Sequence, residues 1–287
     1  MTQLIGGPVR RHPGTRPGPR CFRLLLIVGL LLTPRAAAAG DWGHKLPGLP
    51  TDFVFGYGTL IDADSRDRTA GAQVPAIPVR VSAEFGYLRA WVDRCSCGFT
   101  ALGLRKPHPG EPAMTINGVL YAVNASNLPA FDRREGDYRR VPLPRRMIEA
   151  VSWQELPRDG QIWVYVPIGP GAEPGVDLPQ ASAQFPMLQT YIDLVLRGSL
   201  IYGSDFAKEI IRTTTDWSLF WLNDREQPRR PWVHTADYQA IDTLLRQTAP
   251  ASKRFGDRLF PEDYAARRLA QPAPDPSPNP AHPSPAR

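Results

Sequence analysis

The sequence has few of the residues that bind metals or form structural disulfides. It contains three cysteines and five histidines in 287 residues. Cys21 falls in a basic N-terminal stretch, and Cys95 and Cys97 are only two positions apart, a spacing that permits only a strained disulfide. No further cysteine or close histidine pair completes a tetrahedral site, which excludes structural zinc. We expect Cys95 and Cys97 to be separate small side chains in a loop after a strand.

The part of the sequence that should fold also lacks an excess of positive charge. Six basic residues and no acidic residue precede Gly40, so removing residues 1–39 leaves 28 basic and 28 acidic residues. A nucleic-acid-binding domain keeps its positive field in the folded part. The isoelectric point of about 9.4 therefore does not indicate a DNA or RNA partner.

The apolar run near the N-terminus is too short to cross a membrane. Leu24–Leu32 is nine residues long, whereas a spanning helix needs about 20. A basic stretch precedes the run and the small residues 36–39 follow it, which is the order of a secretory signal. We expect residues 1–39 to be an export signal, or an N-terminal anchor if uncleaved, and the protein to be periplasmic or secreted. A wrongly assigned start would instead make it cytoplasmic.

Between the two ends the sequence pattern changes once. Alternating apolar and polar residues predict strands within 74–91 and over 99–104, 118–123, 138–143 and 161–166, with a short helix over 128–135. From Phe185 the apolar residues recur at helical spacing as far as Gly198. A second helix, capped by Ser204 or Asp205, and a last helix over 237–248 follow. The seven prolines of 271–287 predict a disordered tail.

The stretch Phe53–Leu60 reads as a buried strand that runs into a glycine-bracketed turn. Gly56 and Gly58 on either side of Tyr57 let the backbone approach a ligand and turn successive N–H groups to one side. By itself the stretch favours a structural turn after a core strand, because short glycine motifs are weak signals. The acidic residues that follow lack the glycine and the final glutamate of a calcium loop.

Joined to a second segment, this turn resembles that of the γ-glutamylcyclotransferase-like superfamily. Tyr57-Gly58-Thr59-Leu60 matches the turn of that superfamily, and Gly118–Val123 matches its Gly-Val-Leu-Tyr-x-Val strand. The segment Asp132–Tyr138 matches the one that carries the catalytic glutamate, here Glu135. The Phe-Gly and Arg-Glu pairs are closest to the ChaC-type and related bacterial branches.

The resemblance implies an α+β fold with a small mixed or antiparallel β-barrel and flanking helices. It covers residues 50–200, and we expect 201–270 to be a helical extension packed on that domain. Outside the resemblance, Asp224 and Arg225 are candidates for a structural ion pair. The predicted strands come first along the chain and the predicted helices follow, without regular alternation. This order also indicates the α+β class rather than a doubly wound sheet.

The implied activity is that of a metal-independent and cofactor-free acyltransferase or lyase. It turns a γ-glutamyl amide or peptide into 5-oxoproline and a free amine by attack of the substrate's own α-amino group. The reaction needs proton transfer at two nitrogens, and one carboxylate of raised pKa can perform both transfers. Glu135 is that general acid and base by resemblance. Taken alone, a glutamate at a helix end would more simply pair with a neighbouring arginine.

The remaining site residues follow from the same resemblance. The backbone of Gly56, Tyr57, Gly58, Thr59 and Leu60 would hold the α-carboxylate or the γ-oxyanion of a small γ-glutamyl substrate. Tyr191, seven residues before Gly198, matches a tyrosine that contacts substrate. Tyr138 and Tyr165 either line the pocket or pack in the core.

Three alternatives to this activity differ in how much of it they keep. The leaving group could be that of glutathione, of a γ-glutamyl dipeptide or of a γ-glutamylamine. An exported member of the fold could bind a ligand without catalysis. A serine or cysteine hydrolase is poorly supported, because no Gly-x-Ser-x-Gly motif occurs.

Overall fold

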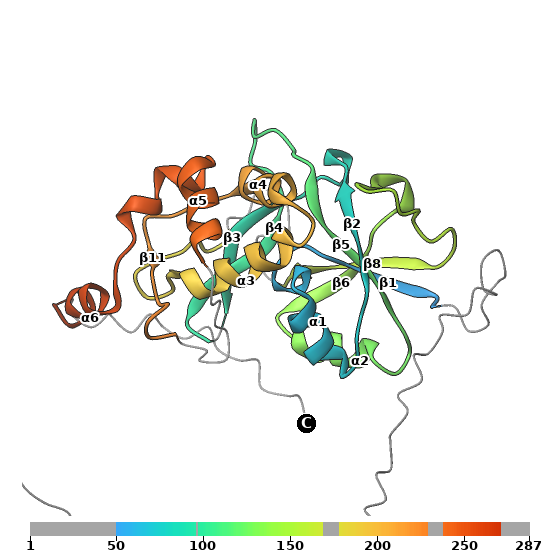
Figure 1. The fold of residues 1–287 in the computed structure, drawn as a ribbon, viewed down its shortest axis with the longest axis horizontal. Helices are drawn as coiled ribbons and strands as arrows, with labels where there is room; N and C mark the ends of the chain where they lie inside the picture. The colour runs from blue at the N-terminus through green and yellow to red at the C-terminus, as the bar shows by residue number, and fades with distance from the viewer. Residues whose placement is uncertain (1–49, 96, 169–177, 229–237, 271–287) are drawn as a thin grey trace, which may run out of the picture. The chain divides into compact units, whose positions relative to one another are not determined.

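A computed structural model describes residues 50–95, 97–168, 178–228 and 238–270 of the chain (Figure 1). The predicted export signal at 1–39 and the predicted tail at 271–287 lie outside these residues. None of the described helices is long and apolar enough to cross a membrane.

The larger sheet has six strands, and β1 (Asp52–Gly56) lies in its interior (Figure 1). β1 runs parallel to β8 (Gln161–Pro167) and antiparallel to β5 (Ile116–Val123). The full order is β6 (Tyr138–Pro142), β8, β1, β5, β2 (Ala76–Val81) and β7 (Ile148–Ala150). This interior position suits an uninterrupted apolar strand, because β1 is covered on both faces.

The side chains of β1 alternate between two cores. Val54 packs into one apolar cluster, and Phe53 and Phe55 pack into another. All three are buried. Successive side chains of a strand point to opposite faces of the sheet. The prediction of a buried strand before the glycine turn is therefore confirmed.

Two smaller sheets complete the β structure. β3 (Leu88–Cys95) pairs with β4 (Phe99–Arg105) and with the short β10 (Thr214–Thr215), and β9 (Met187–Leu188) pairs with β11 (Trp221–Leu222). The β3–β4 ladder contains a bulge, since Trp91 pairs with Leu102 and Asp93 already pairs with Ala101. No ladder among the described residues joins β6 to β7, so the predicted barrel is not confirmed.

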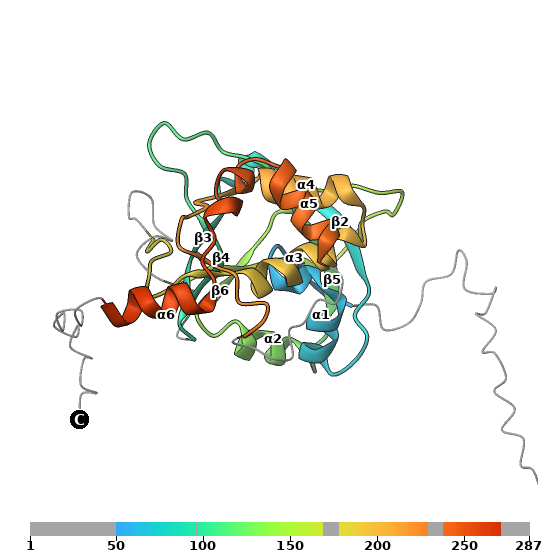
Figure 2. The same cartoon turned by 60° about the vertical axis from the view of Figure 1, so that its left-hand side comes forward.

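Six α-helices complete the part of the chain that the structure describes, and the predicted α+β class is confirmed. They are α1 (Ala63–Ala70), α2 (Leu128–Arg134), α3 (Gln189–Leu200), α4 (Ser204–Arg212), α5 (Gln239–Gln247) and α6 (Pro261–Ala270). α3, α4 and α5 pack against one another and lie together in both views, and α1 lies beside α2 (Figures 1 and 2).

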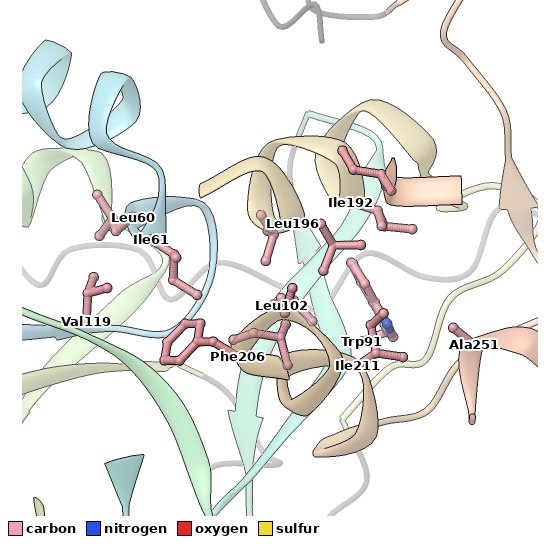
Figure 3. Close-up of a cluster of buried hydrophobic side chains, with 14 of the residues drawn as sticks. Leu60, Ile61, Trp91, Leu102, Val119, Ile192, Leu196, Phe206, Ile211 and Ala251 are labelled. Atoms are coloured by element: carbon pink, nitrogen blue, oxygen red, sulfur yellow. The ribbon is translucent and has the colours of Figure 1, made fainter. Parts of the chain in front are cut away.

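The larger core joins the early strands to the later helices. Trp91 of β3, Leu102 of β4, Ile192 of α3 and Phe206 of α4 belong to one buried cluster (Figure 3). Ile241 of α5 belongs to it as well. The helices after residue 200 thus share apolar contacts with the strands, while the predicted domain division at that residue stays a prediction.

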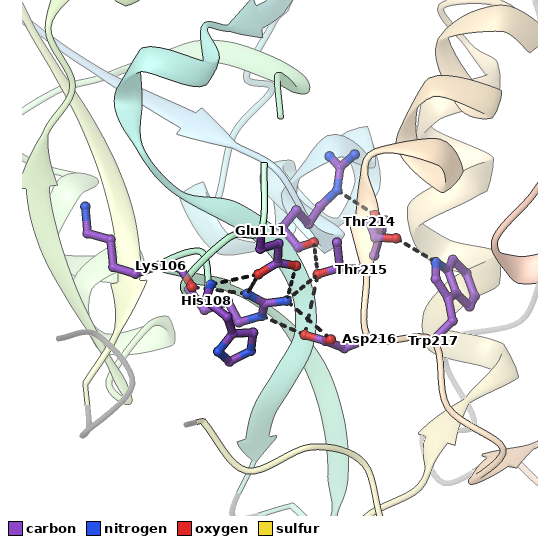
Figure 4. A network of polar contacts seen from close by, with 9 residues as sticks. Lys106, His108, Glu111, Thr214, Thr215, Asp216 and Trp217 are labelled. Carbon is purple, nitrogen blue, oxygen red and sulfur yellow. Dashed lines mark hydrogen bonds and ion pairs between the residues drawn. The ribbon is translucent and has the colours of Figure 1, made fainter. Parts of the chain in front are cut away.

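A buried ion-pair network fixes the end of β4 (Figure 4). The Arg105 side chain is 5% exposed, and it pairs with Glu111 at 2.6 Å and with Asp216 at 2.7 Å. Each of the two carboxylates makes two contacts with the guanidinium. The buried positive charge of Arg105 is therefore fully compensated. The network joins β4 to the loop after it and to the residue that follows β10.

Several helix predictions need correction. Gly198 does not end its helix: α3 continues to Leu200, and a Cβ on Gly198 would lie 2.5 Å from the Cα of Asp62. Its lack of a side chain serves the close approach of α3 to that segment. The N-cap of α4 is Gly203, and neither Ser204 nor Asp205 caps it. The helix predicted as the last is followed by α6.

Two pairing predictions are also wrong. Cys95 and Cys97 are joined by a disulfide. Arg225 pairs with Asp193 at 2.7 Å and with Asp242 at 2.8 Å, while Asp224 accepts hydrogen bonds from Thr190. The partners of Arg225 lie on α3 and α5, a placement that neighbouring residue types do not show.

Candidate functional site

The turn after β1 presents free backbone amides. Gly58 is the N-cap of the 3₁₀ helix η2 (Thr59–Ile61), and its carbonyl accepts from the N–H of Ile61 at 3.0 Å. The first N–H groups of a helix have no partner within it. Accordingly, the N–H groups of Gly58, Thr59 and Leu60 have no acceptor in the described part of the chain. They are available to an anionic ligand.

A buried arginine donates a hydrogen bond to the backbone of this turn. Arg89 of β3 is fully buried, and one of its terminal nitrogens donates to the Asn117 carbonyl at 2.7 Å and to the Tyr57 carbonyl at 3.5 Å. Its other contacts are to the hydroxyls of Thr213 and Thr214 and to further neutral oxygens. Burial lowers the pKa of Arg89 to about 9, so it remains charged at neutral pH. This charge favours an anion at the turn.

Glu135 is the residue that caps the C-terminal end of α2. Its N–H donates to the Phe131 carbonyl at 2.9 Å, as expected where a short helix ends. Its side chain is only 16% exposed and pairs with the Nε of Arg134 at 3.2 Å. Burial raises the pKa of Glu135 above its usual value, against the opposing charge of Arg134, and the nearby Asp93 carboxylate raises it further. A carboxylate whose pKa is raised is a stronger proton acceptor than an ordinary glutamate, as a general base requires.

Arg134 connects Glu135 to the turn. Its terminal nitrogens donate to the Thr59 hydroxyl at 2.9 Å and to the Ser65 hydroxyl and carbonyl at 2.9 and 3.0 Å. Ser65 is on α1, which follows η2 directly. One guanidinium therefore fixes the general-base candidate relative to the segment that carries the free amides.

The bulge in β3 lies opposite a residue that anchors two tyrosines. The Leu102 N–H donates to the Tyr191 hydroxyl at 3.2 Å, and the Leu102 carbonyl accepts from the Tyr138 hydroxyl at 3.0 Å. Burial raises the pKa of both tyrosines, so both hydroxyls stay protonated at neutral pH. Because the Tyr191 oxygen accepts from the backbone, its proton is free to be donated elsewhere.

Two other tyrosines are held mainly by structural contacts. The Tyr57 hydroxyl donates to the Tyr165 carbonyl at 2.9 Å, and the Tyr165 hydroxyl donates to Asp132 at 2.8 Å. Their rings lie at the cavity described next, but their polar ends are already satisfied. These two tyrosines line the wall of the cavity and do not offer a hydrogen-bond donor to a ligand.

The structure brings the nine predicted site residues to one cleft. An inner recess is lined by turn residues 56–60 together with Glu135, Tyr138, Tyr165 and Tyr191. An outer cavity of about 570 Å³ shares Thr59, Glu135, Tyr138 and Tyr191 with the recess. This volume lies in the range of small-molecule sites, about 300–1,000 Å³. The contact of these residues with substrate stays a prediction.

The outer cavity contains residues that the sequence did not suggest. Asp93 of β3 and Cys95 of the disulfide line it, as do the exposed Arg68 and Arg133. No ion pair or hydrogen bond to the guanidinium of Arg68 or Arg133 occurs among the described residues. The signal that could have found Asp93 is a lone acid directly after the apolar run Ala90-Trp91-Val92.

The acidic and sulfur-containing side chains do not form an evident metal centre. In the described ranges, no group of three or more histidine, cysteine, aspartate or glutamate residues is placed to hold a metal ion. The chemistry available to the cleft from its own residues is proton transfer, hydrogen bonding to an anion and binding of charged groups.

Comparisons with known proteins find likeness among solved structures only. No family model matches the chain, and no curated protein matches it significantly. A structure named gamma-glutamyl cyclotransferase is 11% identical with a TM-score of 0.41, over 67% of this chain and 96% of that one. YkqA from Bacillus subtilis is 20% identical with a TM-score of 0.39, over 55% of this chain and 52% of that one.

A yeast gamma-glutamyl cyclotransferase specific to glutathione is also similar, at 14% identity and a TM-score of 0.28, over 55% of this chain and 86% of that one. TM-scores of 0.41 and below are too low for the superpositions to support a reaction or a substrate. What the cleft does must be inferred from its own residues.

Proposed function

We propose that this chain is a γ-glutamylcyclotransferase-like enzyme that releases 5-oxoproline from a γ-glutamyl amide or peptide. The observation that carries the proposal is the pairing of two features in one recess. Glu135, with a carboxylate of raised pKa, lines the same recess as the free amides of Gly58, Thr59 and Leu60. A cyclisation that moves protons and develops an oxyanion needs both features.

The reaction proceeds by an internal attack on the substrate. Glu135 takes a proton from the α-ammonium group, and the resulting amine attacks the γ-carbonyl carbon to form the new C–N bond. The oxygen of that carbonyl becomes an oxyanion, which the turn amides and the Tyr191 hydroxyl stabilise. Protonated Glu135 then gives its proton to the departing nitrogen as the original amide bond breaks and the carbonyl re-forms, and the freed carboxylate takes the second proton from the ring nitrogen and passes it to the amine. The products are 5-oxoproline and a free amine.

The outer cavity favours a leaving amine that carries a carboxylate. Arg68 and Arg133 line this cavity without a partner among the described residues, and an anionic group there would pair with them. A γ-glutamyl amino acid or peptide meets this requirement, whereas a simple γ-glutamylamine does not. Because both arginines are exposed, we expect the replacement of either one to change substrate specificity only modestly.

Replacement of Glu135 tests the reaction. Glu135→Gln keeps the size of the side chain and removes its proton exchange, so release of 5-oxoproline from γ-glutamyl substrates should fall by about 10³-fold. Glu84→Gln, at an exposed glutamate outside the cleft, is the matched control and should keep full activity. Turnover that survives Glu135→Gln contradicts the assignment of the base.

A substrate panel separates the remaining alternatives. Glutathione, γ-glutamyl dipeptides and γ-glutamylamines should be compared by 5-oxoproline release in the wild-type protein and in Arg133→Gln. We expect Arg133→Gln to lower kcat/KM for the carboxylate-bearing leaving groups and to leave γ-glutamylamines unchanged. Binding of these compounds without any release of 5-oxoproline would instead identify a ligand-binding member of the fold.

A further inference from the structure

Asp93 is a carboxylate in the cleft that the proposed proton transfers do not use. It follows the bulge of β3 and lines the outer cavity together with Glu135, Tyr138 and Tyr191. The preceding residues of the strand, Trp91 and Val92, are buried in apolar clusters. Asp93 is thus the residue at which β3 changes from apolar packing to the wall of the cleft.

No cation in the described part of the chain pairs with Asp93. The Tyr138 hydroxyl lies near Asp93 but donates to the Leu102 carbonyl, and the other acidic groups around Asp93, Asp137 and Glu135, add negative charge. Glu135 differs from Asp93 in this respect, since Arg134 pairs with it. A largely buried carboxylate without a cation is costly unless a ligand supplies the positive charge. In keeping with this, burial raises the pKa of Asp93 to about 6.

We infer that Asp93 is the binding group for a primary ammonium on the ligand, namely the α-ammonium of a γ-glutamyl substrate. This inference rests on the proposed function, because the ligand that carries the ammonium is the γ-glutamyl substrate proposed there. Asp93 holds the ammonium near Glu135, and Glu135 removes the proton. The two carboxylates divide the work: one binds the positive charge and the other exchanges the proton.

The inference predicts that Asp93 recognises a single substituent of the ligand. Glutarylglycine is γ-glutamylglycine without the α-amino group and keeps both carboxylates and the amide. Full-length protein carrying Glu135→Gln, which prevents turnover, is titrated calorimetrically with each compound, with and without Asp93→Asn. We expect Asp93→Asn to weaken the affinity for γ-glutamylglycine at least tenfold and to change the affinity for glutarylglycine by less than twofold.

Asp159→Asn is the matched control. Asp159 is exposed and lies outside both the recess and the outer cavity, so its replacement should change the affinity for either compound by less than twofold. Asp93→Ser is a second variant that removes the charge with a smaller side chain, and it should give the same discrimination. The inference is overturned if the affinity falls equally for the two compounds or does not fall for γ-glutamylglycine. It is also overturned if the Glu135→Gln parent binds neither compound.

The same experiment separates this inference from the proposed reaction. If wild-type protein releases no 5-oxoproline but the titrations show discrimination that depends on Asp93, the ammonium site stands and the cyclisation fails. If wild-type protein releases 5-oxoproline and Asp93→Asn binds γ-glutamylglycine normally, the cyclisation stands and the ammonium site fails.

Discussion

Arg134 pairs with the carboxylate of its sequence neighbour Glu135 at 3.2 Å while donating to the Thr59 hydroxyl at 2.9 Å. Residues 59 and 134 lie on segments far apart in the sequence, and this guanidinium joins them. Its positive charge acts on Glu135 in the opposite direction to burial, which is the larger effect on the pKa of that carboxyl. Arg134 therefore controls both the position and the proton affinity of the proposed base.

The first prediction concerns the pH dependence of activity. Removal of the charge in Arg134→Gln should raise the pKa of Glu135 further above its usual value. The base form is then lost at a higher pH, so the acidic limb of the kcat/KM profile should move to higher pH. Arg134→Lys keeps the charge and should move the limb less. A limb that stays in place or moves to lower pH would contradict the electrostatic role of Arg134.

The second prediction concerns the pH dependence of stability. The folded-state pKa of Asp93, about 6, lies above the value of an unfolded aspartate, so its ionised form destabilises the fold. This cost is absent below the unfolded pKa and is complete above pH 6. Asp93→Asn should therefore raise the free energy of unfolding at pH 7.5 by on the order of 2 kcal/mol, and leave it unchanged near pH 3.5.

Denaturant unfolding of both proteins at the two pH values measures this difference. A destabilised Asp93→Asn protein at pH 7.5 would show that the carboxylate has a stabilising partner in solution. An equal gain at both pH values would point to packing instead of charge.

The third prediction concerns the space at the turn. A Cβ on Gly58 would lie 3.3 Å from the Tyr191 hydroxyl oxygen, and its backbone φ of −124° does not require glycine. Gly58→Ala should therefore leave the free energy of unfolding within about 1 kcal/mol and raise KM roughly tenfold or more by shifting Tyr191. The same change made on a Tyr191→Phe background should raise KM less, because the clashing oxygen is gone. Independent, additive effects would show that the two residues do not interact.

The fourth prediction concerns the packing of α3. A Cβ on Gly198 would lie 2.5 Å from the Cα and 2.6 Å from the N of Asp62, and backbone atoms cannot move aside as a flexible side chain can. Gly198→Ala should therefore destabilise the protein by about 1–3 kcal/mol. Gly256→Ala meets nothing within 4 Å and is the matched control, with an expected change within about 0.5 kcal/mol. Equal melting temperatures for the two variants would show that α3 does not approach Asp62 this closely.

Local patterns in the sequence were sufficient for the parts of the fold that neighbouring residues determine. The alternation of Phe53, Val54 and Phe55 corresponds to a strand buried on both faces, and Glu135 does cap a short helix. These features depend on the period of the side chains and on residue types that end a helix, which act over a few residues.

Patterns of the same kind failed where a residue serves a distant contact. Gly198 is a residue type that commonly ends a helix, but here it allows the close approach between α3 and Asp62. Arg225 stands beside Asp224 yet pairs with Asp193 and Asp242. In each case the local interpretation was reasonable, and the packing of another element decided the outcome.

The amino-acid sequence by itself determined the glycine turn, the glutamate at the end of α2 and the order of the motifs that resemble γ-glutamylcyclotransferases. Only the tertiary structure decided that the turn, Glu135 and Tyr191 line one cleft, that Arg134 joins Thr59 to Glu135, and that Asp93 faces the same space without a cation. The reason is physical: burial and the charges that approach across the fold set the pKa of a carboxyl, and both depend on segments that are far apart in the chain.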